Sequence, residues 1–307
     1  MGMRRTGLPV EQTPGAYRRN VGAIKIATIH DGTLSTSFND VVGADARLCE
    51  AAHRAAMRSV PPRFTCNIFV IDNEKELLLI DAGCGQTAPE AGRAPDGLEL
   101  LGIDPKHIDA VLMTHMHRDH AGGLIRPDGS PRYPRAELIM HENELEFWQD
   151  SANLARLSQS QQVDFVLANA VFGAYADRLR PVKDNEIQRG LTAVSTPGHT
   201  PGHTAWLIDS DGEQLLIWGD VIHFPGFQFA IPEASVRYDL DPEAAASARR
   251  RVLDMVSSNR IPVAGVHLDF PAYGRVRALP DGTYSYVSEI WTSDLPVLSH
   301  GKAYPTP

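Results

Sequence analysis

Short apolar runs separated by turn residues recur along most of the chain, and this pattern predicts strands. Residues 66–71 and 76–80, for example, flank the turn Asp72-Asn73-Glu74, as two neighbouring strands would. Strands are predicted at residues 21–30, 66–71, 76–80, 110–113, 136–140, 191–195, 205–208, 214–218, 261–266 and 284–287.

Helical spacing of apolar positions between these runs predicts helices. The best-marked start is Asp241-Pro242-Glu243, which places a capping Asp, a Pro at the first helical position and an acid near the positive end of the helix dipole. That helix is predicted to reach about Ser258. Others are predicted at residues 44–58, near 98–101 and 105, and in an insert from 142 to about 178.

No linker or repeat divides this series, so we expect one domain spanning residues 1–307, with residues 1–15 as an N-terminal arm. Strands followed by a helix and further strands occur twice, which predicts an α+β fold with two packed sheets and outer helices.

Composition narrows the function classes. The net charge is −9, and the one dense basic run, Arg249-Arg250-Arg251, is expected on a solvated helix face, so a nucleic-acid partner is not expected. No apolar run approaches the roughly 18 residues of a membrane span, and no signal peptide is recognisable. The three cysteines include no CxxC pair. We expect reduced thiols and a cytoplasmic location.

The strongest chemical signal is a dense group of polar residues directly after the apolar run 111–113. Three histidines and one aspartate lie within six residues, in the order His115, His117, Asp119, His120. Four such side chains cannot all enter a core, and neutral imidazole and carboxylate are the common ligands of zinc. The segment therefore predicts a metal site.

Three more potential ligands each follow an apolar run, where a sheet would hold them in place. They are His199, Asp220 and His267. Singly, each would be interpreted as a structural residue or a helix cap. Together with the first four they complete two coordination shells.

These residues resemble the ligands of the metallo-β-lactamase superfamily, whose HxHxDH loop matches His115, His117, Asp119 and His120. The resemblance implies an αββα sandwich of two mixed β-sheets with outer helices. It also implies two divalent ions, zinc being the expected metal, with one held by His115, His117 and His199, the second held by Asp119, His120 and His267, and Asp220 bridging both. Asp81, at the end of a predicted strand, would orient a ligand from behind the metals, although a turn aspartate before Gly83 is the alternative.

A bridging aspartate and the flanking segments narrow the resemblance to the methyl parathion hydrolase and lactonase branch, whose members are usually dimers. The matching segments are residues 14–18, 114–124, 146–148, 198–204 and 267–271. This likeness covers about residues 14–290 and predicts a homodimer.

His223 follows the bridging Asp220 by three residues. In the acyl-homoserine lactonases that this chain resembles, this place is similar to one held by a tyrosine that touches the substrate. A polar group there favours a lactone or carboxylic ester over a phosphotriester, unless His223 only bonds the backbone. Phe224, Phe227 and Phe229 are candidates for an apolar pocket wall, with ordinary core packing as the alternative. His203 is expected to hydrogen-bond backbone beneath the site.

The predicted function is a dinuclear metal-dependent hydrolase of small lactones or aryl carboxylic esters, in which hydroxide bridging the metals attacks the carbonyl. Asp119 or Asp220 would move the proton, and His223 would assist. An organophosphate triester hydrolase is the first alternative, and a glyoxalase-II-like thioesterase is the second.

Overall fold

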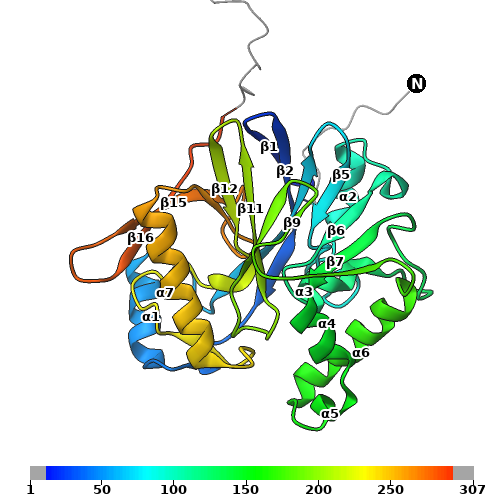
Figure 1. Ribbon diagram of the computed structural model, residues 1–307. Coiled ribbons are helices and arrows are strands. Elements are labelled where there is room, and N and C mark those ends of the chain that lie inside the picture. Colours follow the sequence, from blue (N-terminus) through cyan, green and yellow to red (C-terminus); the bar gives the residue numbers. More distant parts are fainter. Residues whose placement is uncertain (1–11, 293–307) are drawn as a thin grey trace, which may run out of the picture.

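A computed structural model describes residues 12–292 of the chain. Two seven-stranded sheets lie face to face in this range, and helices cover their outer faces (Figure 1). This arrangement confirms the α+β sandwich expected from the sequence. The expected arm falls mostly in residues 1–11, outside the described residues.

The first sheet contains antiparallel strands at one end and parallel strands at the other, so it is mixed as predicted. Parallel neighbours at its far end are connected through helices. In spatial order its strands are β1 (Ala16–Val21), β2 (Ile24–Ser35), β4 (Arg63–Asp72), β5 (Leu77–Ile80), β6 (Ala110–Leu112), β7 (Glu137–His141) and β8 (Leu179–Val182).

The second sheet is also mixed, because β12 and β14 pair in parallel while its other neighbours are antiparallel. In spatial order its strands are β16 (Tyr284–Ser288), β15 (Tyr273–Ala278), β14 (Val263–Ala264), β12 (Glu213–Ile217), β11 (Thr204–Ser210), β10 (Leu191–Ser195) and β9 (Ile187–Gln188). A small separate pair joins β3 (Val41–Val42) to β13 (Ser235–Val236).

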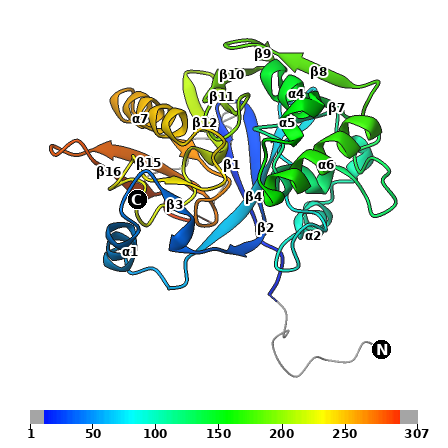
Figure 2. The same cartoon turned by 90° about the horizontal axis from the view of Figure 1, so that it is seen from below.

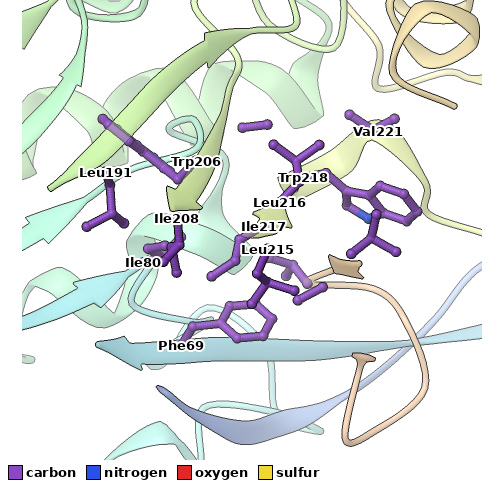
Figure 3. Packing of buried hydrophobic residues seen from close by; sticks show 14 of the residues in the cluster. Phe69, Ile80, Leu191, Trp206, Ile208, Leu215, Leu216, Ile217, Trp218 and Val221 are labelled. Carbon is purple, nitrogen blue, oxygen red and sulfur yellow. The ribbon is translucent and has the colours of Figure 1, made fainter. Parts of the chain in front are cut away.

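The main core fills the space between the sheets (Figure 3). Phe69 and Ile80 come from the first sheet, and Trp206 and Ile217 come from the second; all four are fully buried. Successive side chains of a strand point to opposite faces, so the neighbours of Phe69 pack instead under the outer helices. Both faces of the central strands are therefore apolar.

The helices complete the outer layers. Figure 2 shows α7 on one side of the strands and the α4–α6 group on the other. Val252, Leu253 and Val256 of α7 join the core of the second sheet. The helix bounds are α1 Ala46–Ala55, α2 Ala94–Leu100, α3 Arg118–Ala121, α4 Glu142–Gln149, α5 Ser151–Leu154, α6 Gln159–Ala174 and α7 Pro242–Ser258.

The mainly helical insert predicted from residue 142 to about 178 is confirmed, and it contains α4, α5 and α6. Two expectations need correction. The strand predicted at residues 21–30 begins too early, because a turn with Gly22 at φ 53° separates β1, which ends at Val21, from β2, which begins at Ile24. The expected solvated basic face fails at Arg249, which is 1% exposed and donates to the carbonyls of Val221, Pro232 and Ala234.

Candidate metal centre

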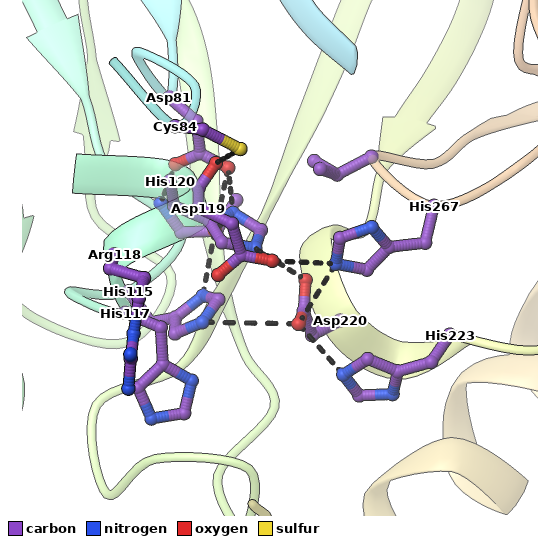
Figure 4. A network of polar contacts seen from close by, with 12 residues as sticks. Asp81, Cys84, His115, His117, Arg118, Asp119, His120, Asp220, His223 and His267 are labelled. Carbon is purple, nitrogen blue, oxygen red and sulfur yellow. Dashed lines mark hydrogen bonds and ion pairs between the residues drawn. The ribbon is translucent and has the colours of Figure 1, made fainter. Parts of the chain in front are cut away.

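Loops that leave the sheets at one edge bring all seven predicted ligands together, and Figure 4 labels all of them except His199. Ligands tend to bind at the carboxyl ends of strands because the loops there converge. His115, His117, Asp119 and His120 follow β6, His199 lies between β10 and β11, Asp220 follows β12, and His267 follows β14.

Three imidazoles form the first group. His199 Nε2 lies 3.1 Å from His115 Nε2 and 2.9 Å from His117 Nδ1. All three side chains are buried. Tetrahedral zinc with bonds of about 2.0–2.1 Å separates its ligand atoms by about 3.3–3.4 Å. The three nitrogens are thus close to the spacing that one ion requires.

Asp119, His120 and His267 form the second group. Asp119 Oδ2 lies 3.8 Å from His120 Nε2 and 3.6 Å from His267 Nε2. The two imidazoles are fully buried, whereas the side chain of Asp119 is 16% exposed. This group therefore has one carboxylate that reaches toward solvent.

The carboxylate of Asp220 lies between the two groups. Its Oδ1 is 3.0 Å from His120 Nε2, and its Oδ2 is 3.2 Å from both His199 Nε2 and His267 Nε2. Asp220 is only 4% exposed. One carboxylate thus contacts imidazoles of both groups, as a bridging ligand would.

Unpartnered buried atoms support the presence of metal ions. His120 Nε2 and Asp220 Oδ1 have no hydrogen-bond partner among the described residues, although they are only 3.0 Å apart. Close approach without hydrogen-bond geometry is expected of atoms whose lone pairs point at a shared ion. Leaving such groups unsatisfied would otherwise cost about 1–3 kcal/mol each. The donor set fits two divalent ions.

Protonation of the imidazoles follows from burial and from the neighbouring carboxylates. Burial and adjacent imidazoles hold the pKa values of His115 and His117 well below the ordinary value, so both rings are neutral. Burial acts in the same direction on His199, but Asp220 and Asp239 outweigh it and raise the pKa of His199 to about 9. Metal binding would displace that proton.

Asp81 supports the second group from behind. Its Oδ2 accepts from His120 Nδ1 at 2.7 Å and from the Thr114 hydroxyl at 2.8 Å, while its Oδ1 accepts from the Thr114 amide. A proton held on His120 Nδ1 leaves Nε2 free to face Asp220. Carboxylates that orient a metal-binding histidine make this kind of hydrogen bond to the ring nitrogen that does not face the metal.

Two other ligands are held in the same way. His199 Nδ1 donates to Asp239 Oδ1 at 2.7 Å, and His267 Nδ1 donates to the Thr65 carbonyl at 2.7 Å. Each contact fixes the ring orientation and directs Nε2 toward the centre. Asp239 was not anticipated from the sequence, because a single aspartate 40 residues from its partner carries no local signal.

Glu144 of α4 was also missed, although it connects two metal-ligand loops. Its fully buried carboxylate accepts from Met116 N and Trp148 Nε1, at 2.8 and 2.6 Å, and from Thr200 Oγ1 and Gly202 N, at 2.6 and 3.1 Å. Burial raises its pKa, and the four donors oppose that shift. The carboxylate therefore joins the His115–His117 loop to the His199 loop.

His203 lies beneath the centre, as predicted. Its Nε2 accepts from the Asp220 amide at 2.9 Å, and its Nδ1 contacts the Thr196 hydroxyl at 2.7 Å. Burial lowers its pKa to about 3, so it is neutral and can accept at Nε2. His203 thereby fixes the backbone of the central carboxylate.

His223 faces the central carboxylate. Its Nε2 lies 2.7 Å from Asp220 Oδ2, and the ring stacks on His267 with centroids 5.3 Å apart. Burial lowers its pKa to about 4, which keeps the ring neutral. The alternative was that the His223 ring only hydrogen-bonds the backbone. The structure instead places this ring against the Asp220 carboxylate.

A cavity of about 330 Å³ opens over the two groups of ligands. His117, Asp119, Asp220 and His223 reach it from the centre. Its remaining walls are partly apolar and partly polar, and are formed by Leu34, Asp40, Phe64, Thr87, Ala88, Arg118, Ser158, Ser160, Gln161, Asp164, Arg237 and Tyr238.

The predicted aromatic wall is wrong in its residues. Phe224 and Phe227 pack in a small core against α1, and Phe229 packs in the core between the sheets. None of the three is among the residues that line the cavity. Phe64 and Tyr238, which are remote from the motif in sequence, supply its aromatic surface instead.

Comparison with known proteins agrees with this geometry. A profile of the metallo-beta-lactamase superfamily matches residues 61–260, which is about two thirds of the chain. The chain belongs to the metallo-beta-lactamase superfamily. The donor groups and the relatives described next indicate a hydrolase of this superfamily that uses divalent metal ions.

Three similar proteins illustrate the superfamily. An N-acyl homoserine lactonase of Bacillus sp is 24% identical over 214 residues, covering 62% of this chain and 76% of the lactonase. The solved hydrolase AbOPH is 26% identical with a TM-score of 0.86, covering 92% of this chain and all of that one. AidC, a dizinc quorum-quenching lactonase, has 22% identity, a TM-score of 0.83 and the same coverage, and it shows the shared fold.

Among residues 12–292, no helix combines the length and the apolar character that crossing a bilayer requires.

Proposed function

We propose that this chain is a dinuclear metal-dependent hydrolase of lactones or aryl carboxylic esters, with zinc as the expected metal. The observation that carries the proposal is the position of Asp220, whose carboxylate contacts imidazoles of both groups at the floor of a cavity. The seven ligands are those assigned above: His115, His117 and His199 for one ion, Asp119, His120 and His267 for the other, and Asp220 between them.

Two divalent ions bound there would lower the pKa of a water and polarise the ester carbonyl. The protein must then move a proton to the leaving alkoxide. Both carboxylates reach the cavity, but Asp119 suits this task better, because its side chain is 16% exposed, while that of Asp220 is 3% exposed and surrounded by imidazoles. For a lactone the leaving alkoxide stays attached, so the product is a hydroxy acid.

Tyr238 is the group best placed to bind a substrate oxygen. It lines the cavity, and its hydroxyl has no hydrogen-bond partner among the described residues. Burial and nearby carboxylates raise its pKa well above the usual value; the Thr36 side chain opposes that shift. Tyr238 therefore stays protonated and can donate to a carbonyl or ring oxygen. His223, whose Nε2 lies 2.7 Å from Asp220 Oδ2, would act by positioning that carboxylate.

We choose lactones or esters as substrates because the Tyr238 hydroxyl gives the cavity a hydrogen-bond donor, and because lactonases are among the relatives. A phosphotriester with a bulky aryl leaving group would instead favour an apolar wall such as Leu34 and Phe64 provide. Hydrolysis of phosphotriesters, as by methyl parathion hydrolase, is thus the first alternative activity. Hydrolysis of a glutathione thioester is the second alternative.

The test is one substrate panel measured on protein of known metal content. It contains N-acyl lactones, aryl acetates, methyl parathion and a glutathione thioester. The proposal expects the highest kcat/KM for a lactone or an aryl carboxylic ester. A preference for methyl parathion would contradict the substrate class and leave the metal centre in place.

We also propose that the chain forms a homodimer through the region around α1. Leu48 of this helix is 62% exposed, and Met57 just beyond it is 92% exposed. Neither side chain is required by the metal centre. Contact with a second copy of the chain would remove these two apolar side chains from water.

A further inference from the structure

Gln161 of α6 is a buried amide on the wall of the cavity above the metal centre. It is 9% exposed and lines the cavity. Its Oε1 accepts from the Ser158 amide at 3.0 Å and from the Ser158 hydroxyl at 2.8 Å. A backbone N–H can only donate, so the atom that contacts it must be the side-chain oxygen, and the other end of Gln161 is the NH₂ group.

This NH₂ group is left for a ligand. Within residues 12–292, the side-chain hydrogen bonds of Gln161 all use Oε1, and the N–H donors of Nε2 have no protein acceptor. Nε2 is not sealed inside the protein, so a molecule in the cavity can reach it. Because buried polar groups normally find a partner, a free amide on a cavity wall indicates that a substrate supplies the acceptor.

Arg118 adds a second donor to the same wall. Its Nε and Nη2 donate to the two oxygens of Asp164, at 2.8 and 3.2 Å, and its Nη2 also donates to the Ser160 hydroxyl at 2.9 Å. These contacts fix the guanidinium, while its Nη1 makes no hydrogen bond in the described part of the chain. Asp164 is 5% exposed and balances the charge of Arg118, so this wall offers N–H donors without a net positive charge.

The two donors lie away from the groups that would hold the reacting carbonyl. Figure 4 shows Arg118 and His223 on opposite sides of the metal ligands. Tyr238 lies beside His223, with ring centroids 5.3 Å apart. One cavity reaches all of these side chains. A substrate with its reacting carbonyl over the ions and near Tyr238 can therefore extend a substituent toward α6.

We propose that Gln161 is a specificity-determining residue, which donates from Nε2, beside Nη1 of Arg118, to a second carbonyl oxygen on the acyl part of the substrate. This inference rests on the proposed function and deepens it, because it favours lactones or aryl esters that carry a neutral carbonyl away from the bond that is cleaved. A neutral acceptor fits this wall better than a carboxylate, since Asp164 already balances Arg118. A few such polar groups commonly set the specificity of a pocket.

The test compares 4-nitrophenyl heptanoate with its 4-, 5- and 6-oxo analogues, in which one CH₂ becomes a carbonyl. The variant is Gln161→Glu. It keeps the oxygen that accepts from Ser158 and the capping box at the start of α6, and it replaces only the NH₂ group by a second carboxylate oxygen. Gln159→Glu is the matched control, because it places the same charge in the same helical turn at an exposed residue outside the cavity wall.

In the wild type and in Gln159→Glu, we expect at least one oxo analogue to exceed the heptanoate in kcat/KM by about 3–10-fold, as one hydrogen bond would provide. The difference should appear in KM, because a remote contact binds substrate and transition state equally. In Gln161→Glu the preference should fall to about one or below, while kcat for the heptanoate changes less than about twofold. Comparing the same substrate ratio between proteins cancels the intrinsic reactivity of the esters.

An oxo preference that is absent from the wild type, or unchanged in Gln161→Glu, would overturn the proposal. An equal loss of kcat for all four esters in Gln161→Glu, with KM unchanged, would also overturn it, because Gln161 would then act on the metal centre and not on the substituent. If the protein with two zinc ions hydrolyses no ester or lactone at all, the proposed function itself is contradicted, and this specificity with it.

Discussion

At the scale of single residues, Asp220 is held from three sides. His203 fixes its backbone, His223 contacts its Oδ2, and Arg249 binds the carbonyl of the following Val221. These side chains surround a carboxylate that two groups of imidazoles share. A residue placed to orient Asp220 should affect turnover without binding substrate itself.

Replacing His223 with Leu removes the contact to Asp220 Oδ2 and should lower lactone turnover by roughly 10–100-fold, or about 1.4–2.8 kcal/mol of transition-state stabilisation. Methyl parathion turnover should stay level or rise, because the cavity becomes less polar. Phe224→Leu is the control, since Phe224 packs outside the cavity. Both rates are measured at equal metal content. Unchanged lactone hydrolysis in His223→Leu would show that the contact has no catalytic effect.

Tyr238→Phe deletes only a hydroxyl that makes no hydrogen bond of good geometry within residues 12–292. We expect kcat/KM for a lactone to fall about tenfold, which corresponds to about 1.4 kcal/mol. The free energy of unfolding should change by less than about 0.5 kcal/mol, because the hydroxyl makes only a weak contact with the Thr36 side chain. Steady-state kinetics and thermal unfolding on one preparation check both parts. A stability loss with normal kinetics would place the hydroxyl in the fold and not in the reaction.

At the scale of elements, α4 connects loops that are far apart in the chain. Glu144 accepts four hydrogen bonds, and a glutamine amide could replace only some of them while turning its own NH₂ toward the other donors. Glu144→Gln should therefore lower the free energy of unfolding by about 1–3 kcal/mol and weaken zinc binding. Denaturant titration and a zinc competition assay are the measurements.

Glu142→Gln on the same helix is the matched control, because its side chain is 37% exposed and only approaches Lys183 at 3.6 Å. It should change stability by less than about 0.5 kcal/mol. Equal behaviour of the two variants would mean that the buried hydrogen bonds of Glu144 do not hold the metal loops.

The elements differ in how well the sequence predicts them, and the reasons are local. Helix α7 follows the prediction from Asp241 because its cap, its Pro and its first acid are consecutive residues. The β6 loop was found because its four ligands lie within six residues. The strand β15 was missed, because Arg275 and Arg277 interrupt its apolar character.

Residues that act through tertiary contacts gave no such signal. Glu144, Asp239 and Tyr238 are single polar residues, and only the fold brings them to the centre. Phe224 and Phe227 show the converse error. They lie close to Asp220 in sequence, but the chain turns after His223, where the Gln228 side chain accepts from the His223 and Phe224 amides, and carries them into a separate core.

At the scale of the whole molecule, the exposed apolar side chains near α1 predict a homodimer. Light scattering at micromolar concentration should report twice the 33.6 kDa mass of one chain. Met57→Glu should shift the equilibrium toward monomer without altering metal content, because Met57 lies outside the centre. A mass of 33.6 kDa for the wild type would refute the dimer.

The proposed function requires two ions that act together on one substrate. The rate of lactone opening can be measured with metal-depleted protein as zinc is added in known amounts. We predict almost no activity without metal, a rise with added zinc, and a plateau at two equivalents per chain, with Asp220→Ala staying far below it. Full activity without metal, a plateau at one equivalent, or no lactone opening at two equivalents would refute the dinuclear lactonase.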